Sequence, residues 1–256
     1  MSEKREELFG VNPLLEALRG GTREFDKVYI ARGVHSKGIE EVVHLCREQK
    51  IPVHHEVKEA LDRIAGTPKH QGILGIVAVK GYSSVEDILE VAKRKKEPPF
   101  VLILDSVEDP RNLGAIIRTA EGAGVHGIII PKHRSAGLNS TVAKTSAGAL
   151  EYIKVARATN LYQTMEWLKK QGLWIYGLDM GGETEYTDIS CDAPLAVIMG
   201  GEGRGIRESI RKACDVRVSI PLFGRVSSLN VSVASGIILF EIATHRLKRF
   251  KKADKA

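Results

Sequence analysis

Five short runs of consecutive apolar residues, each followed by a stretch with helical character, most constrain how this chain can fold. The runs are VLILD (101–105), GIIIP (127–131), LWIYGLD (173–179), PLAVIMG (194–200) and VRVSIP (216–221). The helical stretches fall near 113–123, 141–148, 160–171, 205–213 and 231–250. Strands that are apolar on both faces and alternate with helices are typical of a parallel sheet that helices cover on both sides. The sequence therefore predicts an α/β fold for this part of the chain.

A smaller region of mixed α/β character precedes these runs. Asn12-Pro13 can open a helix that Gly20-Gly21 closes, and a strand-like KVYI (27–30) follows. Between this region and the first apolar run lies a short helical stretch whose charged end is stopped by two prolines. We therefore expect three parts, which are an N-terminal domain over 1–80, a linker over 81–98 and a C-terminal domain over 99–256.

Composition argues against several classes of protein. The 256 residues are 43% hydrophobic and 27% charged, which is ordinary for a globular chain and neither collagen-like nor disordered. No run of about 18 or more apolar residues occurs, and the start MSEKREEL lacks the apolar core of a signal peptide. We therefore expect a cytoplasmic protein rather than a membrane-spanning or secreted one.

The formal net charge of +6 is concentrated near the end of the chain. Residues 246–256 hold six basic residues and one acidic residue, a net charge of +5. A basic tail favours RNA only weakly, because charges on a terminal helix are often simply solvated. Composition alone therefore leaves the partner open.

The cysteines and the paired histidines give no sign of a metal site. Cys46, Cys191 and Cys214 lie far apart with no C-x-x-C spacing, so neither a disulfide framework nor a zinc site is indicated. Three small apolar side chains in a reducing compartment are the simpler interpretation. His54-His55 lie on a strand-like segment far from any carboxylate motif. We therefore expect no metal and no metal-dependent hydrolase.

Four glycines in six residues follow the fourth apolar run, in Gly200-Gly201-Glu202-Gly203-Arg204-Gly205. Ligands of parallel sheets bind in loops beyond the carboxyl ends of strands, and glycines let backbone N–H groups approach a ligand closely. The spacing matches neither the G-x-G-x-x-G dinucleotide pattern nor a phosphate-binding loop with its lysine. A purely structural turn is the alternative, but Glu202 in such a turn has little packing rationale.

The loops 105–112, 179–188 and 221–230 lie at the same edge of the predicted sheet, and their residues allow two interpretations. Asn112 stands where a helix cap would, and capping alone explains an asparagine. Arg118 lies in an apolar part of that helix, so its charge either extends outward to water or pairs within a site. Ser227, Ser228 and Asn230 precede the last helix, and all are competent caps. Capping and binding both remain open for them.

Three segments, taken in order and at these separations, resemble the three motifs of the SpoU (TrmH-like) RNA 2′-O-ribose methyltransferases of the SPOUT class. They are N-L-G-A-I-I-R-T-A (112–120), I-M-G-G-E-G-R-G-I (198–206) and I-P-L-F-G-R-V-S-S-L-N-V-S-V-A (220–234). The resemblance covers about 97–250. In addition, F-G-V-N-P-L-L-E-A-L (9–18) and H-Q-G (70–72) are similar to the RNA-binding domain that precedes the catalytic domain in bacterial 23S ribosomal RNA guanosine 2′-O-methyltransferases.

This resemblance implies a parallel-sheet catalytic domain whose C-terminal segment threads a loop to form a deep trefoil knot. It also implies S-adenosylmethionine as the cofactor, a homodimer that completes each active site, and methylation of a ribose 2′-hydroxyl, expected on a guanosine of 23S ribosomal RNA. The implied cofactor contacts fall at Gly200, Ile220 and Leu229, with neighbouring Met199, Gly201, Leu222 and Ser228. The implied catalytic and substrate-binding positions are Asn112, Arg118, Glu202, Ser228 and Asn230.

The chemistry of the implied reaction assigns roles to these residues. The family proposal makes the arginine, here Arg118, the base. A guanidinium has a pKa above about 12 and no acceptor, so we expect Arg118 to orient an RNA phosphate and stabilise the developing alkoxide, unless a phosphate removes its proton. Glu202 is the alternative base, or the group that holds Arg118 or the ribose. Asn112 and Asn230 would position the ribose, and an activated sulfonium methyl group needs no metal.

An RNA with an unstacked nucleotide is the expected partner, because DNA lacks the 2′-hydroxyl and bases inside an A-form helix are hard to read. The candidates for contacts to its backbone are Arg111, Lys132, Arg134, Lys144, Arg204 and Arg225. Transfer RNA is the alternative substrate. A non-catalytic RNA-binding or ribosome-assembly factor of the same fold is the alternative from a different class, although such a factor has no chemical need for Arg118, Glu202 and Asn230.

Overall fold

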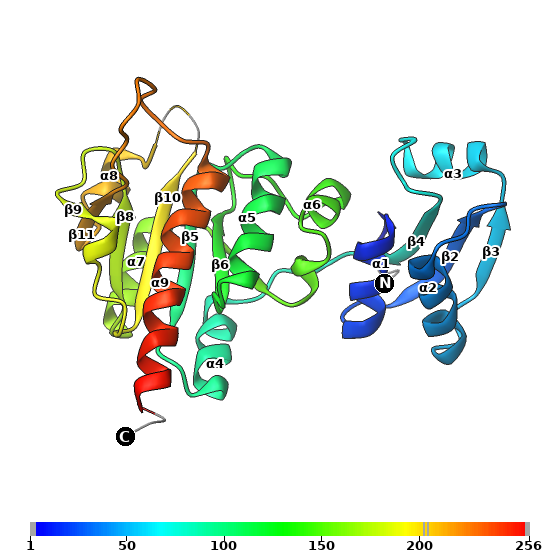
Figure 1. Cartoon of the computed structure of the whole chain (residues 1–256), viewed down its shortest axis with the longest axis horizontal. Coiled ribbons are helices and arrows are strands. Elements are labelled where there is room, and N and C mark those ends of the chain that lie inside the picture. The colour runs from blue at the N-terminus through cyan, green and yellow to red at the C-terminus, as the bar shows by residue number, and fades with distance from the viewer. Residues whose placement is uncertain (1–3, 202, 204, 254–256) are drawn as a thin grey trace. The chain divides into compact units, whose positions relative to one another are not determined.

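Figure 1 shows the chain, in a computed structural model, as two units of α/β structure. The structure describes residues 4–201, 203 and 205–253, with side chains described as far as Lys248. The N-terminal unit comprises Met1–Gly81 and Gly137–Tyr152, and the C-terminal unit comprises Tyr82–Ala136 and Ile153–Ala256. Among the described residues, no helix is long and apolar enough to cross a membrane.

A seven-stranded sheet of order β7-β6-β5-β10-β8-β11-β9 forms the centre of the C-terminal unit, and every neighbouring pair is parallel. The strands are β5 (Phe100–Asp105), β6 (Gly127–Pro131), β7 (Lys154–Ala158), β8 (Trp174–Leu178), β9 (Thr184–Glu185), β10 (Leu195–Gly200) and β11 (Val216–Ser219). β5, β6 and β10 are buried along nearly their whole length, because both faces of the sheet are covered. The predicted α/β fold with a parallel sheet is confirmed.

Helices cover both faces of this sheet (Figure 1). α5 (Pro110–Gly122) and α9 (Val231–Ala253) pack together on one face, and α7 (Leu161–Lys170) lies on the other. A buried cluster of apolar side chains joins α7 to α4 (Val85–Lys95), to α8 (Glu208–Arg211) and to the inner strands. α8 is shorter than the helix predicted over 205–213, because the glycine-rich turn occupies the first part of that range.

The start of α5 shows that Asn112 is not the helix cap, which was one of its two interpretations. Asp109 caps this helix, since its carboxylate accepts a hydrogen bond from the backbone N–H of Arg111 at 2.8 Å, and Pro110 is the first helical residue. Asn112 therefore lies inside the first turn and not at the cap. Helix capping does not account for its side chain.

The N-terminal unit contains a four-stranded sheet of order β1-β4-β2-β3. β4 pairs antiparallel with β1 and β2, and β3 pairs parallel with β2. The elements of this unit are β1 (Arg5–Phe9), α1 (Val11–Gly20), β2 (Phe25–Ala31), α2 (Lys37–Glu48), β3 (Val53–Glu56), α3 (Lys58–Ala65) and β4 (Ile73–Ala78). Fully buried His70 joins α3 to the turn before β4, because its ring contacts the Asp62 carboxylate at 2.8 Å and accepts from the N–H of Gly72 at 3.0 Å.

The two units differ from the expected domain boundaries at two segments. The expected linker 81–98 contains α4, which buries Ile88 and Ala92, and the N–H of Ser83 donates to the carbonyl of Val155 at 2.9 Å. This stretch is therefore part of the C-terminal unit. Gly137–Tyr152, expected in the C-terminal domain, instead packs with the N-terminal unit through α6 (Ser140–Thr145) and the 3-10 helix η1 (Ala149–Glu151).

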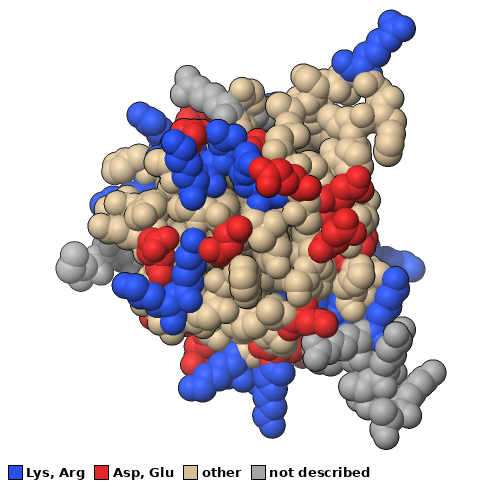
Figure 2. All heavy atoms as spheres, turned by 90° about the vertical axis from the view of Figure 1, so that its left-hand side faces the viewer, with Lys and Arg blue, Asp and Glu red and all other residues tan. Residues whose placement is uncertain are grey.

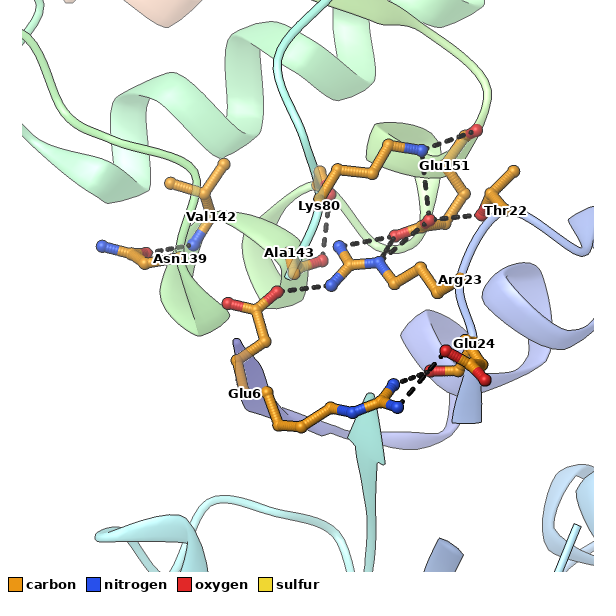
Figure 3. A network of polar contacts seen from close by, with 11 residues as sticks. Glu6, Thr22, Arg23, Glu24, Lys80, Asn139, Val142, Ala143 and Glu151 are labelled. Carbon is orange, nitrogen blue, oxygen red and sulfur yellow. Dashed lines mark hydrogen bonds and ion pairs between the residues drawn. The ribbon is translucent and has the colours of Figure 1, made fainter. Parts of the chain in front are cut away.

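Glu151 is the centre of the contacts that hold this segment on the N-terminal unit (Figure 3). Its side chain is 2% exposed and accepts hydrogen bonds from Thr22 at 2.6 Å and from Arg23 Nε at 3.0 Å, while Lys80 Nζ lies 3.3 Å away. Arg23 also pairs with Glu6. Burial acts to raise the pKa of Glu151, but the charges of Arg23 and Lys80 and the hydrogen bonds outweigh it and lower that pKa. Removing one partner of a buried ion pair costs about 3–5 kcal/mol.

The thiols behave as apolar groups. Burial raises the pKa of Cys46, Cys191 and Cys214 to about 11, so all three are neutral at physiological pH. Within the described ranges, no group of three or more His, Cys, Asp and Glu side chains is placed to hold a metal ion.

Candidate active site

A cavity of about 750 Å³ lies where β8 and β10 end. This is the edge of a parallel sheet at which ligands bind. Residues from five stretches of chain line it, which are 178–180, 199–206, 208–211, 220–222 and 227–234. In Figure 1 the loop between β11 and α9, drawn in orange, extends past this end of the sheet.

The glycine-rich turn after β10 forms one wall of the cavity and is folded tightly on itself. Gly201 and Gly205 pair across the turn, and a Cβ on Gly200 would lie 1.9 Å from the carbonyl carbon of Gly205. A Cβ on Gly201 would lie 2.0 Å from the carbonyl oxygen of Ser106. Two glycines are therefore required by backbone contact. Gly203 and Gly205 have φ angles of 77° and 60°, which favour glycine for a second reason.

The buried carboxylate of Asp105 holds this turn against the end of β5. It is 0% exposed and accepts hydrogen bonds from the backbone N–H of Arg207 at 3.0 Å and from Arg207 Nε at 2.8 Å. The carbonyl of Asp105 accepts from the N–H of Gly201 at 2.8 Å. One residue therefore contacts the turn near its beginning and just after its end.

A pair of asparagines lies next to the cavity, at the start of two neighbouring helices. Asn230 Nδ2 donates to Asn112 Oδ1 at 3.2 Å, which joins the first turn of α5 to the residue before α9. Asn230 Oδ1 accepts from the N–H of Ser232 at 2.9 Å, so Asn230 also caps α9. Asn230 therefore both caps α9 and lines the cavity.

The structure collects most of the predicted site residues around this cavity. All seven residues expected at the cofactor line it, together with Asn230: Met199, Gly200, Gly201, Ile220, Leu222, Ser228 and Leu229. Asn112 joins them through its bond to Asn230. Arg118 does not line the cavity, and its side chain is exposed on α5. Glu202 lies outside the described residues.

The predicted RNA-backbone contacts are dispersed. Arg111, Lys132, Arg134 and Arg225 are exposed. Lys144 is engaged within the N-terminal unit, where its ammonium donates to the carbonyl of Lys69 and lies 5.1 Å from the centre of the Phe9 ring. Burial, followed by the charge of Lys69, lowers the pKa of Lys144. Arg204 lies outside the described residues.

Three charged side chains that line the cavity were not among the residues predicted from the sequence. Arg211 pairs with Asp179 at 3.3 Å and with Glu208, and all three residues line the cavity. The hydrogen bonds that Arg211 donates to Glu208 and Asp179 raise the pKa of Arg211, and the bond accepted from Arg211 lowers the pKa of Glu208. The sequence indicates the loop that holds Asp179, because it follows a strand. The sequence does not indicate that Arg211, which lies in α8 after β10, pairs with a residue of that loop.

Two family models match the chain. A model described as the SpoU rRNA Methylase family matches residues 99–240. A second, described as RNA 2′-O ribose methyltransferase substrate binding, matches residues 8–83. The chain belongs to the SpoU methylase family. The family expected from the three motifs is confirmed, and a substrate-binding domain precedes the methylase domain.

Relatives of known sequence match this SpoU family chain over nearly its whole length. It is 39% identical over 246 residues, which are 96% of this chain and 98% of the relative, to a putative TrmH family tRNA/rRNA methyltransferase, YacO, of Bacillus subtilis (strain 168). It is 38% identical over 249 residues to a putative TrmH family tRNA/rRNA methyltransferase of Staphylococcus haemolyticus (strain JCSC1435), covering 97% and 98% of the two chains. The chain is an RNA methyltransferase of this family.

Solved structures share the fold. The SpoU methyltransferase AviRb of Streptomyces viridochromogenes, in complex with AdoMet, superposes with a TM-score of 0.80 at 23% identity, covering 95% of this chain and 91% of that one. An AdoMet-bound rRNA methyltransferase of Sinorhizobium meliloti gives a TM-score of 0.77 at 26% identity, covering 94% and 87%.

Gly200→Ala tests whether the tight turn is required. The added methyl group has to displace the backbone of Gly205, so we expect a loss of about 1–3 kcal/mol in unfolding free energy, measured as a lower melting temperature. Gly224→Ala is the matched control, since Gly224 has open space around it and a φ outside the left-handed region. Equal melting temperatures for the two variants would contradict the requirement.

Proposed function

We propose that this methyltransferase uses S-adenosylmethionine to methylate a ribose 2′-hydroxyl, on a guanosine of 23S ribosomal RNA. The observation that carries the proposal is the single cavity in which segments from the second and third motifs meet, next to the asparagine of the first. Bound AdoMet in two structural relatives supports the choice of cofactor.

The cavity has the chemistry that such a cofactor needs. Its volume of about 750 Å³ lies within the range of about 300–1,000 Å³ typical of small-molecule sites. Gly200 and Gly201 of the turn bring backbone to the wall of the cavity, and Ile220, Leu222 and Leu229 offer apolar surface. The ion pair of Asp179 and Arg211 supplies charged groups at one end.

The residues of this chain then have positioning and electrostatic roles. When bound, S-adenosylmethionine supplies a methyl group already activated on a sulfonium. Asn112 and Asn230 would hold the ribose with its 2′-hydroxyl toward the cofactor site, and positioning of this kind supplies roughly 7–11 kcal/mol. Arg118 stabilises the alkoxide charge that develops on the oxygen. The 2′-proton leaves to Glu202, or to Arg118 where an RNA phosphate has removed a proton from the guanidinium, and a positioned base gives about 10²–10⁴ in rate.

Transfer of a labelled methyl group tests the proposed function. We expect label from S-adenosylmethionine in a large-subunit ribosomal RNA transcript and none in bulk transfer RNA, with 2′-O-methylguanosine identified by mass spectrometry. Label in transfer RNA alone would keep the reaction and overturn the substrate. Cofactor binding without label in any RNA, including pre-ribosomal particles, would favour a non-catalytic assembly factor.

We propose that the N-terminal unit and the exposed basic residues of the C-terminal unit each contact the substrate RNA. The match of residues 8–83 to a substrate-binding model supports a role of that unit in holding RNA. Arg111, Lys132, Arg134 and Arg225 are exposed on the C-terminal unit and available to phosphates. A ribosomal RNA substrate places the enzyme in the cytoplasm, which fractionation of cells would test.

A homodimer is part of the same proposal, because Arg118 lies outside the cavity of its own chain. An exposed apolar stripe on α9 supports a partner surface there. It consists of Val233, Phe240 and Leu247, which are 52%, 49% and 55% exposed and recur every seven residues. Seven residues are nearly two helical turns, so the three side chains share one face. Two-fold pairing through this face and α5 would bring the partner's Arg118 to the cavity.

Mixed dimers separate an Arg118 that acts in its own chain from one that acts in the partner. Arg118→Ala and Asn230→Ala should each abolish methylation, and Arg118→Ala should bind S-adenosylmethionine nearly as the wild type does. A mixed dimer of the two variants, purified through two different tags, should regain about half of the wild-type activity, because one of its two sites is then complete. No recovery would show that Arg118 acts within its own chain, and a monomer in light scattering would overturn the dimer.

We also propose that the chain is knotted. The sheet order supports this, since β11 lies between β8 and β9, which are consecutive in sequence. The loop that joins β8 and β9 passes close to β11, because a Cβ on Gly182 would lie 2.4 Å from the carbonyl carbon of Val218. The connection from β8 to β9 therefore spans the strand from which the chain continues to α9, as the proposed threading requires.

Pulling on both ends of a single molecule tests the knot. A threaded chain tightens on itself, so its extended length should fall short of 256 residues at about 3.3–3.6 Å each. A fully extended length would contradict threading.

A further inference from the structure

Phe223 is the most exposed large apolar side chain among the described residues, with 96% of its surface open to solvent. It lies in the loop between β11 and α9, which extends past the end of the sheet in Figure 1. Its neighbour Leu222 lines the cavity, as do Ser228, Leu229 and Asn230 further along the loop. The ring therefore lies beside the site without being part of the core.

No packing contact accounts for this ring. At 96% exposure its side chain lies outside the core, and in the part of the chain that the structure describes no aromatic ring or cation lies against its faces. Both faces of the ring are open to a planar group.

Charge does not mark the neighbouring surface as a binding site. Figure 2 shows the face of the C-terminal unit that carries β9 and β11, with Lys and Arg interspersed among Asp and Glu. An RNA strand gains little net attraction over such a mixed surface. On the loop itself, exposed Arg225 follows Phe223 by two residues. The loop therefore offers a cation for a phosphate and a ring for a base.

We propose that Phe223 is a positioning residue that stacks on a nucleobase of the substrate RNA, on or next to the nucleotide that is methylated. The inference rests on the proposed function, in which the ribose is held at Asn112 and Asn230. A ribose at Asn230 brings its own base and those of its neighbours to the same loop. Unstacked bases bind on aromatic side chains in single-stranded RNA, and this stacking tolerates any base because each has a π-face.

Four variants test the stacking. Phe223→Ala and Phe223→Leu should raise the KM for the substrate RNA about tenfold. Phe223→Trp keeps an aromatic ring, so its KM should stay near the wild-type value. Val226→Ala is the matched control, since it removes apolar surface from the same loop, where Val226 is 69% exposed, without removing a ring. The affinity for S-adenosylmethionine, measured by calorimetry, should stay within about twofold of wild type in all four, because the ring lies beside the cavity and not in its lining.

The outcomes separate this inference from the proposed function. A wild-type enzyme that methylates RNA, with Phe223→Leu unchanged in KM, overturns stacking alone. If the wild-type protein is a dimer in light scattering and the Phe223→Ala variant is a monomer, the ring contacts the partner subunit instead of RNA. Loss of cofactor affinity assigns it to the cofactor site. A wild-type protein that transfers no methyl group to any RNA overturns the proposed function, and this inference falls with it.

Discussion

The site depends on one buried carboxylate at the end of β5, the strand that pairs with β10. Asp105 is fully enclosed, and a carboxylate in that position is stable only if donors surround it. Arg207 supplies them through its backbone N–H and its guanidinium, and the hydroxyl of Ser106 adds another donor. The strand, the turn after β10 and the start of α8 therefore meet at one residue. Since Gly200 lies against the backbone of Gly205 across the turn and Gly201 lies against that of Ser106, the wall of the cavity has little freedom to move.

Much of this architecture could be predicted from the sequence, because its signals are local. Each apolar run indicates a strand covered on both faces, and glycines directly after a strand indicate a tight turn. The edge of the sheet that holds the ligand follows from parallel pairing alone. The order of the strands could not be predicted in this way. It depends on pairings such as β11 with β8 and β9, between residues far apart in sequence that carry no mark of their partner.

Polar partners were the other part that local reasoning missed. Glu151 stands in an unremarkable Ala-Leu-Glu stretch, and nothing in its neighbourhood indicates a buried pair with Arg23, which is 128 residues away. Asn112 shows the opposite case, in which a plausible local role as a cap was wrong because Asp109 already fills it. The resemblance to the family supplied what local patterns do not, which is the grouping of three distant motifs into one site.

The segment Gly137–Tyr152 bears on how such a chain can be divided. Because it belongs to the N-terminal unit while its flanks belong to the other, the polypeptide crosses between the units three times. A protease that cuts near residue 81 would therefore leave the two pieces still associated through Glu151 and its partners. A fragment that begins at residue 82 would carry Glu151 without Thr22, Arg23 and Lys80, the residues that pair with its carboxylate. The substrate-binding part is thus not an interchangeable module that gene fusion could simply append or remove.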